Sequence, residues 1–205
     1  LEEDTSMLLI KLNDKNRLAG SIFSEVTKSN YNNTPDIDNV DDFRNMFLLV
    51  QEMIASKDIL SIHDISDGGL ITTLLEMCFT KKIGMNLNLS GVDRVMEYLF
   101  SEESGFVIQV KQKDVTEIKT TFTEKGLAAK EIGQLKDDIF SINKDNNELF
   151  TKPIIELEKI WRETSHAIQS LRDNKETADS ELSLLDSNSF SGLISNINFD
   201  ESQIK

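Results

Sequence analysis

Apolar residues along this chain recur at two spacings, one typical of strands and the other of helices. Residues 7–12 form a nearly continuous apolar run, which predicts a strand. Val115, Ile118 and Phe122 recur at helical spacing, and Gly126 follows them as a residue that commonly ends a helix. Because strands and helices alternate in this way, we expect a sheet covered by helices.

The same patterns place the other elements. Further strands are expected over residues 83–89, 106–110, 131–135, 139–142 and 149–150, and helices over 70–78 and 92–99. Another helix is expected to start at Asp41 or Asp42, with one apolar face made of Phe43, Met46, Phe47, Val50, Met53 and Ile54. Residues 29–39 are rich in Asn, Thr and Asp around a proline, which predicts an exposed loop.

The last quarter of the chain differs from the rest. Pro153 is suited to the first turn of a long helix, whose apolar stripe would be a packing face with Trp161 as its anchor. After Asp173 the sequence becomes rich in Ser, Asp and Asn, with short apolar islands. We therefore expect a domain over residues 1–150, a connector helix over 151–174 and an extended linker over 175–205.

Composition and charge exclude several classes of protein. The 205-residue chain is 39% hydrophobic, enough for a packed core, and shows no apolar run long enough to span a membrane. Its net charge of −14 argues against nucleic-acid binding, which needs clustered Lys and Arg. One cysteine and two histidines exclude a structural zinc site, and the lone Cys78 suits a reducing cytoplasm. Because the sequence opens with Leu1 rather than methionine, we expect it to belong to a longer protein.

The run from His63 to Leu70, HDISDGGL, is the most informative part of the sequence. It lies between a strand-like apolar stretch and an amphipathic helix, so it forms a corner where polar groups are exposed on a rigid frame. Aspartate oxygens suit Mg²⁺, whereas a serine hydroxyl and first-turn amides suit a phosphate. A structural interpretation stays open, in which Asp67 is only a helix N-cap and the two glycines only shape a turn.

Three stretches together resemble one enzyme family. HDISDGGL followed by LEMCF at residues 75–79 resembles the HDxSDGGL…LxEMxF signature of phosphoribosylformylglycinamidine (FGAM) synthase. The run LFSEESGFVIQV at residues 99–110 resembles the LFxEExGxVIQV stretch of that family. WRETS at 161–165, with LRDN at 171–174 and Ala178-Asp179, resembles the connector that precedes the glutaminase domain in the large, single-chain form. The matches occur in the family's order across nearly the whole chain.

The resemblance implies a fold and an activity. The fold would be α/β (α+β): a mixed sheet covered by helices, like the C-terminal domain of AIR synthetase, with a helical and extended C-terminal tail. The family is a ligase of purine biosynthesis, a glutamine amidotransferase that converts FGAR, ATP, glutamine and water to FGAM, ADP, phosphate and glutamate. ATP phosphorylates the formyl amide oxygen, ammonia attacks the iminophosphate, and phosphate leaves. The expected partners are the N-type synthetase domain and the glutaminase domain of the same enzyme.

The resemblance also implies roles for individual residues. Asp64 matches the family's magnesium ligand and Ser66 its nucleotide contact, in an auxiliary site that holds ADP with Mg²⁺. Asp67, Gly68 and Gly69 would support the geometry of that site. No catalytic residue is expected in this chain, so we expect ATP or ADP and Mg²⁺ as its cofactors.

For five other side chains, the sequence context does not favour a catalytic role. His63 has no acid–base partner nearby in sequence, and His166 lies among polar positions. Glu102 and Glu103 would point to opposite faces if they lay on a strand, so we expect a surface or hinge carboxylate and a polar contact respectively. Cys78 lies on an apolar helix face and is expected to fill the core.

The chain contains no glycine-rich phosphate loop, no glutaminase nucleophile elbow and no N-type domain. We therefore expect it to be inactive by itself. Two other functions remain open at this point. One is a noncatalytic acidic scaffold or interaction module, in which the corner is only a turn, and the other is a different ATP-dependent enzyme of the AIR-synthetase superfamily.

Overall fold

The structure, a computed structural model, describes residues 4–186. The chain divides after Glu158 into two compact units. The first unit contains a sheet of seven strands in the order β2-β4-β1-β5-β3-β6-β7. All neighbouring strands pair antiparallel except β3 and β6, which are parallel. The strands are β1 Thr5–Lys11, β2 Ser61–Asp64, β3 Met85–Asn88, β4 Gly105–Lys111, β5 Ala128–Leu135, β6 Ile139–Lys144 and β7 Asn147–Pro153.

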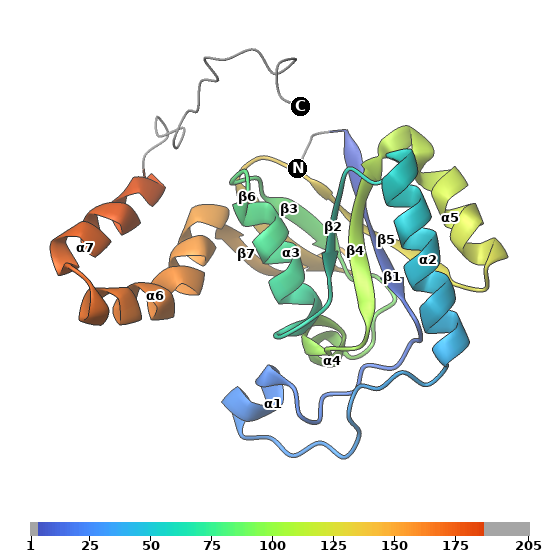
Figure 1. The fold of residues 1–205 in the computed structure, drawn as a ribbon, viewed down its shortest axis with the longest axis horizontal. Coiled ribbons are helices and arrows are strands. Elements are labelled where there is room, and N and C mark those ends of the chain that lie inside the picture. Colours follow the sequence, from blue (N-terminus) through green and yellow to red (C-terminus); the bar gives the residue numbers. More distant parts are fainter. Residues whose placement is uncertain (1–3, 187–205) are drawn as a thin grey trace, which may run out of the picture. The chain divides into compact units, whose positions relative to one another are not determined.

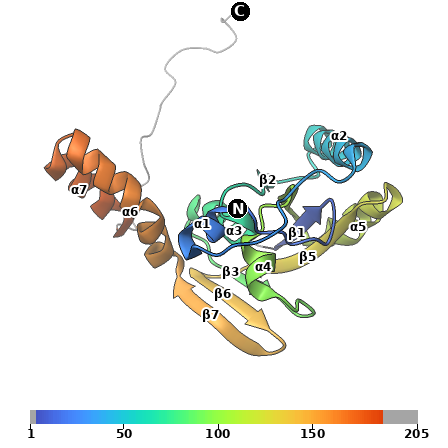
Figure 2. The same ribbon diagram turned by 90° about the horizontal axis from the view of Figure 1, so that it is seen from below.

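Five α-helices belong wholly to this unit: α1 Ile22–Thr27, α2 Val40–Ser56, α3 Gly69–Phe79, α4 Val95–Phe100 and α5 Val115–Glu124. A short 3₁₀ turn, Gln112–Asp114, precedes α5. Helices α2 and α5 cover one face of the sheet, whereas α3 and α4 pack on the other (Figure 1). Figure 2 shows the β6–β7 hairpin at one end of the sheet. The expected α/β fold, with a mixed sheet covered by helices, is confirmed.

Strand β1 is an interior strand of the sheet, between β4 and β5, and it is apolar on both faces. Met7 and Leu9 pack in the core beneath α3 and α4, whereas Leu8 and Ile10 pack beneath α2 and α5. Alternate side chains of a strand point to opposite faces, so a continuous apolar run can fill two cores at once. The run that predicted this strand is therefore also consistent with its interior position.

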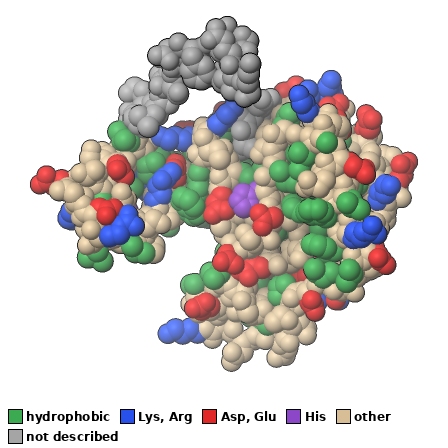
Figure 3. All heavy atoms as spheres, viewed as in Figure 1, with side chains coloured by type: hydrophobic (Ala, Val, Ile, Leu, Met, Phe, Trp, Pro, Cys, Tyr) green, Lys and Arg blue, Asp and Glu red, His purple; other side chains and the backbone are tan. Residues whose placement is uncertain are grey.

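The buried face of α2 is rotated relative to the sequence prediction. Asn39 caps the helix by accepting hydrogen bonds from the backbone amides of Asp41 and Asp42. The buried residues are Met46, Leu49, Val50 and Met53, whereas Phe47 and Ile54, expected in the core, are exposed. Hydrophobic side chains are visible on the outer surface of this helix in Figure 3. The helix has more apolar positions than one face can hold, so packing against the sheet decided which were buried.

Cys78 fills the core as expected, and its burial gives a testable prediction. The side chain is fully buried, and this burial raises the pKa of its thiol to about 12. Thiolates, not thiols, react with alkylating agents, so we expect the folded chain to resist iodoacetamide at pH 8 and to react once guanidinium unfolds it. Mass spectrometry of the alkylated chain measures this difference. Equal labelling rates with and without guanidinium would contradict it.

The C-terminal part contains two helices, α6 Ile154–Arg172 and α7 Lys175–Ser183, and a 3₁₀ turn, Leu184–Asp186. Pro153 ends β7 and directly precedes α6. Residues 175–183, expected to belong to an extended linker, are helical because Asn174 caps them by accepting a hydrogen bond from the Thr177 amide. The rest of that predicted linker, residues 187–205, lies outside the described residues.

Among the described residues, the beginning of the apolar stripe of α6 packs in the core. Ile154 and Leu157 join the core of the first unit. Further along the helix Trp161 is about half exposed, and Leu171 is 90% exposed. His166 lies between the two helices of the second unit, with its Nε2 atom 3.0 Å from a carboxylate oxygen of Asp179. No helix among residues 4–186 has both the length and the hydropathy needed to cross a membrane.

Candidate functional site

The HDISDGGL run forms a tight corner between β2 and α3. Both glycines have left-handed backbone conformations, with φ of +84° at Gly68 and +72° at Gly69, which other residues rarely adopt. The Gly69 amide donates to the Ser66 carbonyl across the turn at 2.9 Å. The hydroxyl of Thr73 donates to the Asp64 carbonyl at 3.1 Å, which ties the first turns of α3 back to the strand. The corner is therefore held by one backbone hydrogen bond and by the hydroxyl of Thr73.

Glu102 provides a second support for the corner. One of its carboxylate oxygens accepts hydrogen bonds from the backbone amides of Gly68 and Ile22, both at 2.9 Å. Glu102 thus connects the glycine turn to the start of α1. Residues 101–104 form the loop between α4 and β4, not a strand, so the alternation that we assumed for Glu102 and Glu103 does not apply. Glu102, expected as a surface or hinge carboxylate, is a partly buried acceptor for these two amides, and a hinge role stays a prediction.

His63 lies between carboxylates. Its Nε2 atom is 3.0 Å from Glu76 on α3, and its Nδ1 atom is 2.7 Å from the Asp64 carbonyl oxygen. Nδ1 also lies 3.5 Å from the Asp64 carboxylate. Glu76 is the partner that sequence reasoning missed, because it comes from the next element of the fold. These contacts orient the imidazole between β2 and α3.

The side chains expected to bind metal and nucleotide project outward from this corner. Asp64 is 65% exposed, and Ser66 and Asp67 are also exposed. The helix N-cap is Gly68 and makes no side-chain capping bond, so Asp67 does not serve as the N-cap. Among residues 4–186 no group of three His, Cys, Asp or Glu side chains is close enough to hold a metal ion. The corner therefore offers single oxygen ligands and not a closed metal cage.

Arg17 and Glu103 form a buried ion pair beside the corner. Arg17 donates to both Glu103 carboxylate oxygens, Nε at 2.5 Å and Nη2 at 2.7 Å, and the Glu103 side chain is only 2% exposed. Arg17 also donates to both carboxylate oxygens of Asp38, at 3.2 and 3.0 Å. The hydrogen bond to Glu103 is the main cause that raises the pKa of the Arg17 guanidinium, so Arg17 remains a cation beside this carboxylate.

This ion pair was not foreseen from sequence. The only signal was the SEES run, which placed two adjacent acids in a family stretch without indicating their partner. The two residues are 86 positions apart, and no local pattern connects them. The pair joins the loop after β1 to the loop before β4, which is a consequence of the sheet order.

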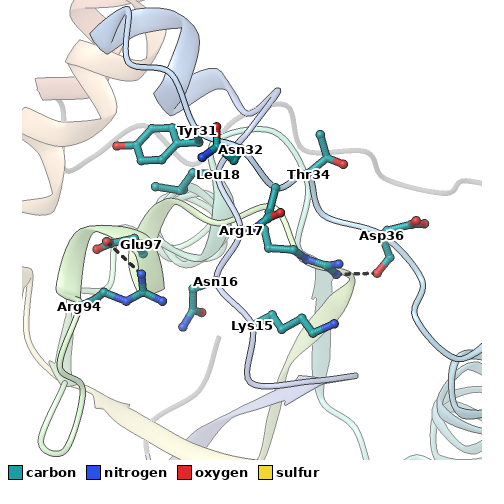
Figure 4. Close-up of a pocket in the computed structure, with 11 residues that line it drawn as sticks. Lys15, Asn16, Arg17, Leu18, Tyr31, Asn32, Thr34, Asp36, Arg94 and Glu97 are labelled. Carbon is teal, nitrogen blue, oxygen red and sulfur yellow. Dashed lines mark hydrogen bonds and ion pairs between the residues drawn. The ribbon is translucent and has the colours of Figure 1, made fainter.

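A cavity of about 650 Å³ opens next to Arg17. It is lined by the loop after β1, by residues 31–36 and by α4 (Figure 4). In Figure 4 the Arg17 guanidinium reaches the backbone carbonyl of Asp36, at 2.8 Å, and Arg94 pairs with Glu97. The cavity lining includes none of residues 63–70. Most of the residues that line this cavity are polar, and they carry both positive and negative charges.

Comparison with known proteins shows the class to which this fold and corner belong. The family model for "AIR synthase related protein, C-terminal domain" matches residues 6–142, and the chain belongs to this family. The fold is similar to PurL of Thermotoga maritima in complex with FGAR, with a TM-score of 0.62 and 12% identity over 76% of this chain. It is also similar to PurL of that organism complexed with ATP, with a TM-score of 0.56 and 11% identity over 75% of this chain.

A second group of structures has the same fold. The hydrogenase maturation protein HypE matches with a TM-score of 0.51 and 13% identity over 75% of this chain and 53% of its own. This chain spans 28% of the PurL structure with FGAR and 25% of the one with ATP. At such identities the likeness shows the fold alone.

Proposed function

We propose that this chain is the second AIR-synthetase-type C-terminal domain, with its connector, of a large single-chain FGAM synthase. In this role it contributes Asp64 and Ser66 to an auxiliary site for a Mg²⁺-bound nucleotide. The observation that supports this most strongly is the corner itself, which presents both side chains outward from a rigid strand–turn–helix frame. The family match over residues 6–142 and the order of the three sequence stretches add to it.

The residues present are compatible with Mg²⁺ at a shared site. Mg²⁺ in nucleotide sites usually takes one or two protein carboxylates and completes its coordination with phosphates and water. Asp64 offers one exposed carboxylate, and the described residues around it supply no closed set of further ligands. The remaining ligands would come from the nucleotide, from water and from the N-type domain. Bound Mg²⁺ would neutralise phosphate charge that this acidic chain would otherwise repel.

The two glycines have a structural part in this proposal. The Gly68 amide already donates to Glu102, and the Gly69 amide already donates to Ser66. Neither amide therefore needs a phosphate as its acceptor. We assign Gly68 and Gly69, with Asp67 beside them, to shaping the turn that supports the nucleotide. Direct contact then falls to the Ser66 hydroxyl and, through the metal, to Asp64.

The activity of the proposed enzyme belongs to more than this chain. Its overall reaction joins nitrogen from glutamine to FGAR at the expense of ATP, and the glutaminase and N-type domains would be the partners in the same protein. We propose a cytoplasmic location, in keeping with a single buried thiol. The chain by itself is proposed to be inactive.

The Asp64→Asn substitution tests the metal role. In the native protein that contains this chain, we expect Mg²⁺-dependent ADP binding to weaken by at least ~10-fold, since even the partners of metal ligands contribute that much to metal affinity. Equilibrium dialysis with labelled ADP, with Mg²⁺ or with EDTA, measures the effect. The exposure of Asp64 means that the substitution leaves folding intact.

Asp137→Asn is the matched control for that experiment. Asp137 is 69% exposed, nearly the same as Asp64, and lies at the β5–β6 turn. We expect this variant to bind ADP like the parent. If Asp64→Asn also bound ADP like the parent, the auxiliary-site proposal would fail and the acidic scaffold function would gain support.

The likeness to HypE favours a second candidate, another ATP-dependent enzyme of the superfamily. The length of the native protein separates the two. Intact mass and peptide mapping should find a product far above 23.2 kDa, with a cysteine-centred glutaminase segment downstream of residue 205. A native product that ends near Lys205 would reject the large FGAM synthase and favour a separate subunit or another member of the superfamily.

A further inference from the structure

A second cavity, of about 520 Å³, lies on the α3–α4 side of the sheet. It is lined by the end of β1 and the loop after it, by the turn before α4, and by the start of β5. None of residues 63–70 lines it, so it is separate from the proposed nucleotide corner. Asn16 and Arg94 line this cavity and also the one in Figure 4, where both are labelled.

Tyr98 is the unusual residue of this cavity. Its hydroxyl is buried and has no hydrogen-bond partner, although a buried hydroxyl normally has one. The ammonium groups of Lys11 and Lys130 lie 5.8 and 5.3 Å from the centre of its ring. Two ammonium groups, from β1 and β5, therefore lie near the ring of a tyrosine on α4 whose hydroxyl is unsatisfied.

The two lysines differ in how firmly they are held. Lys11 donates to the Lys15 carbonyl at 3.0 Å and to the Asn16 side chain at 2.8 Å. The Lys130 side chain makes no hydrogen bond or ion pair with another residue of the described part of the chain, and because it is long it can move to admit a ligand. Three cationic side chains line the cavity, against the two carboxylates of Asp14 and Asp93.

We propose that this cavity binds the phosphate group of a small organic phosphate, held by Lys11 and Lys130 with the Tyr98 hydroxyl as a neutral donor. Lysines act as point charges for phosphate, and these two come from separate strands rather than forming the planar fork that suits a carboxylate. The cavity is larger than a phosphate ion, and Leu9, Leu12 and Val92 line its apolar part. The proposal does not depend on the FGAM synthase assignment.

The pH dependence of binding follows from the environment of Lys11. Burial lowers the pKa of its amine to about 8. The charged and titratable groups that face it are Glu103, Asp14 and Arg17, with Tyr98 from α4 and Lys130 from β5. A bound phosphate favours the ammonium form, so binding takes up protons near pH 8. We expect the affinity to fall as the pH rises above 8, and also below about 6, where the phosphate dianion is protonated.

Phenyl phosphate is a suitable probe, titrated into the 205-residue chain by calorimetry at pH 7 beside inorganic phosphate and benzoate. We expect Tyr98→Phe to weaken phenyl phosphate binding about 10-fold, the size of one hydrogen bond to a charged group. The melting temperature should not fall, because the variant removes only an unsatisfied hydroxyl. Lys130→Met should weaken binding to a similar extent.

Tyr31→Phe and Lys113→Met are the matched controls. Tyr31 lines only the cavity of Figure 4, and Lys113 is exposed on the 3₁₀ turn before α5. Both should bind phenyl phosphate like the parent. The proposal is overturned if the parent chain shows no saturable binding, or if Tyr98→Phe and Lys130→Met bind unchanged. Equal affinity for inorganic phosphate would reject an organic phosphate as the ligand, and equal affinity for benzoate would reject phosphate chemistry.

Discussion

Gly69→Ala lowers the free energy of unfolding by at least ~3 kcal/mol, the expected sum of a left-handed backbone and an overpacked contact. A Cβ atom at this position would lie 2.6 Å from the Phe100 carbonyl carbon and within 2.9 Å of the carbonyl oxygens of Leu99 and Ser101. These are backbone atoms of the segment that ends α4, so they cannot rotate away. Urea denaturation of the 205-residue chain measures the loss.

Gly126→Ala separates the two causes of that loss. Gly126 has nearly the same backbone angle, φ +75°, but a Cβ atom there meets nothing within 4 Å. Its expected cost is therefore only the left-handed conformation, about 1–2 kcal/mol. If the two variants lost equal stability, close packing between the glycine turn and the end of α4 would be disproved as the reason for Gly69.

Arg17→Met lowers the free energy of unfolding by about 3–5 kcal/mol, because it leaves the Glu103 carboxylate buried without its counter-charge. Adding Glu103→Gln to this variant should recover part of the loss, since the neutral amide is less costly to bury. A double-mutant cycle measured by urea denaturation gives the coupling between the two side chains. This result requires that solvent hardly reaches the Glu103 side chain. Only 2% of that side chain is exposed.

Lys152→Met is the matched control for the buried pair. Lys152 forms an exposed ion pair with Glu156 four residues later, at 3.0 Å. Exposed pairs of this kind contribute about 0–1 kcal/mol, so this variant should unfold almost like the parent. A loss for Arg17→Met as small as that for Lys152→Met would mean that the Arg17–Glu103 pair is not buried in solution.

Much of the fold could be predicted from local patterns. The apolar run of residues 7–12 predicted β1, and the spacing of Val115, Ile118 and Phe122 predicted the buried face of α5. The corner of the HDISDGGL run was predicted as a strand–turn–helix and is one. Each of these is set by backbone and side-chain preferences over a few neighbouring residues, which a sequence displays directly.

The candidate site was predictable only in part. The exposed position of Asp64, Ser66 and Asp67 agrees with the polar corner that the sequence indicated. The amides of the two glycines, in contrast, are already engaged by Glu102 and Ser66. An amide's partner depends on which loop approaches it, and sequence spacing does not contain that information.

The sequence by itself determined the class of fold, the strand β1 and the polar corner that carries Asp64, because each depends on local periodicity and turn chemistry. Only the tertiary structure decided the pairing of Arg17 with Glu103, the buried face of α2 and the gathering of Lys11, Tyr98 and Lys130. These features depend on which strands become neighbours. Contacts between residues far apart in the chain arise from the packing of whole elements, and no local pattern encodes them.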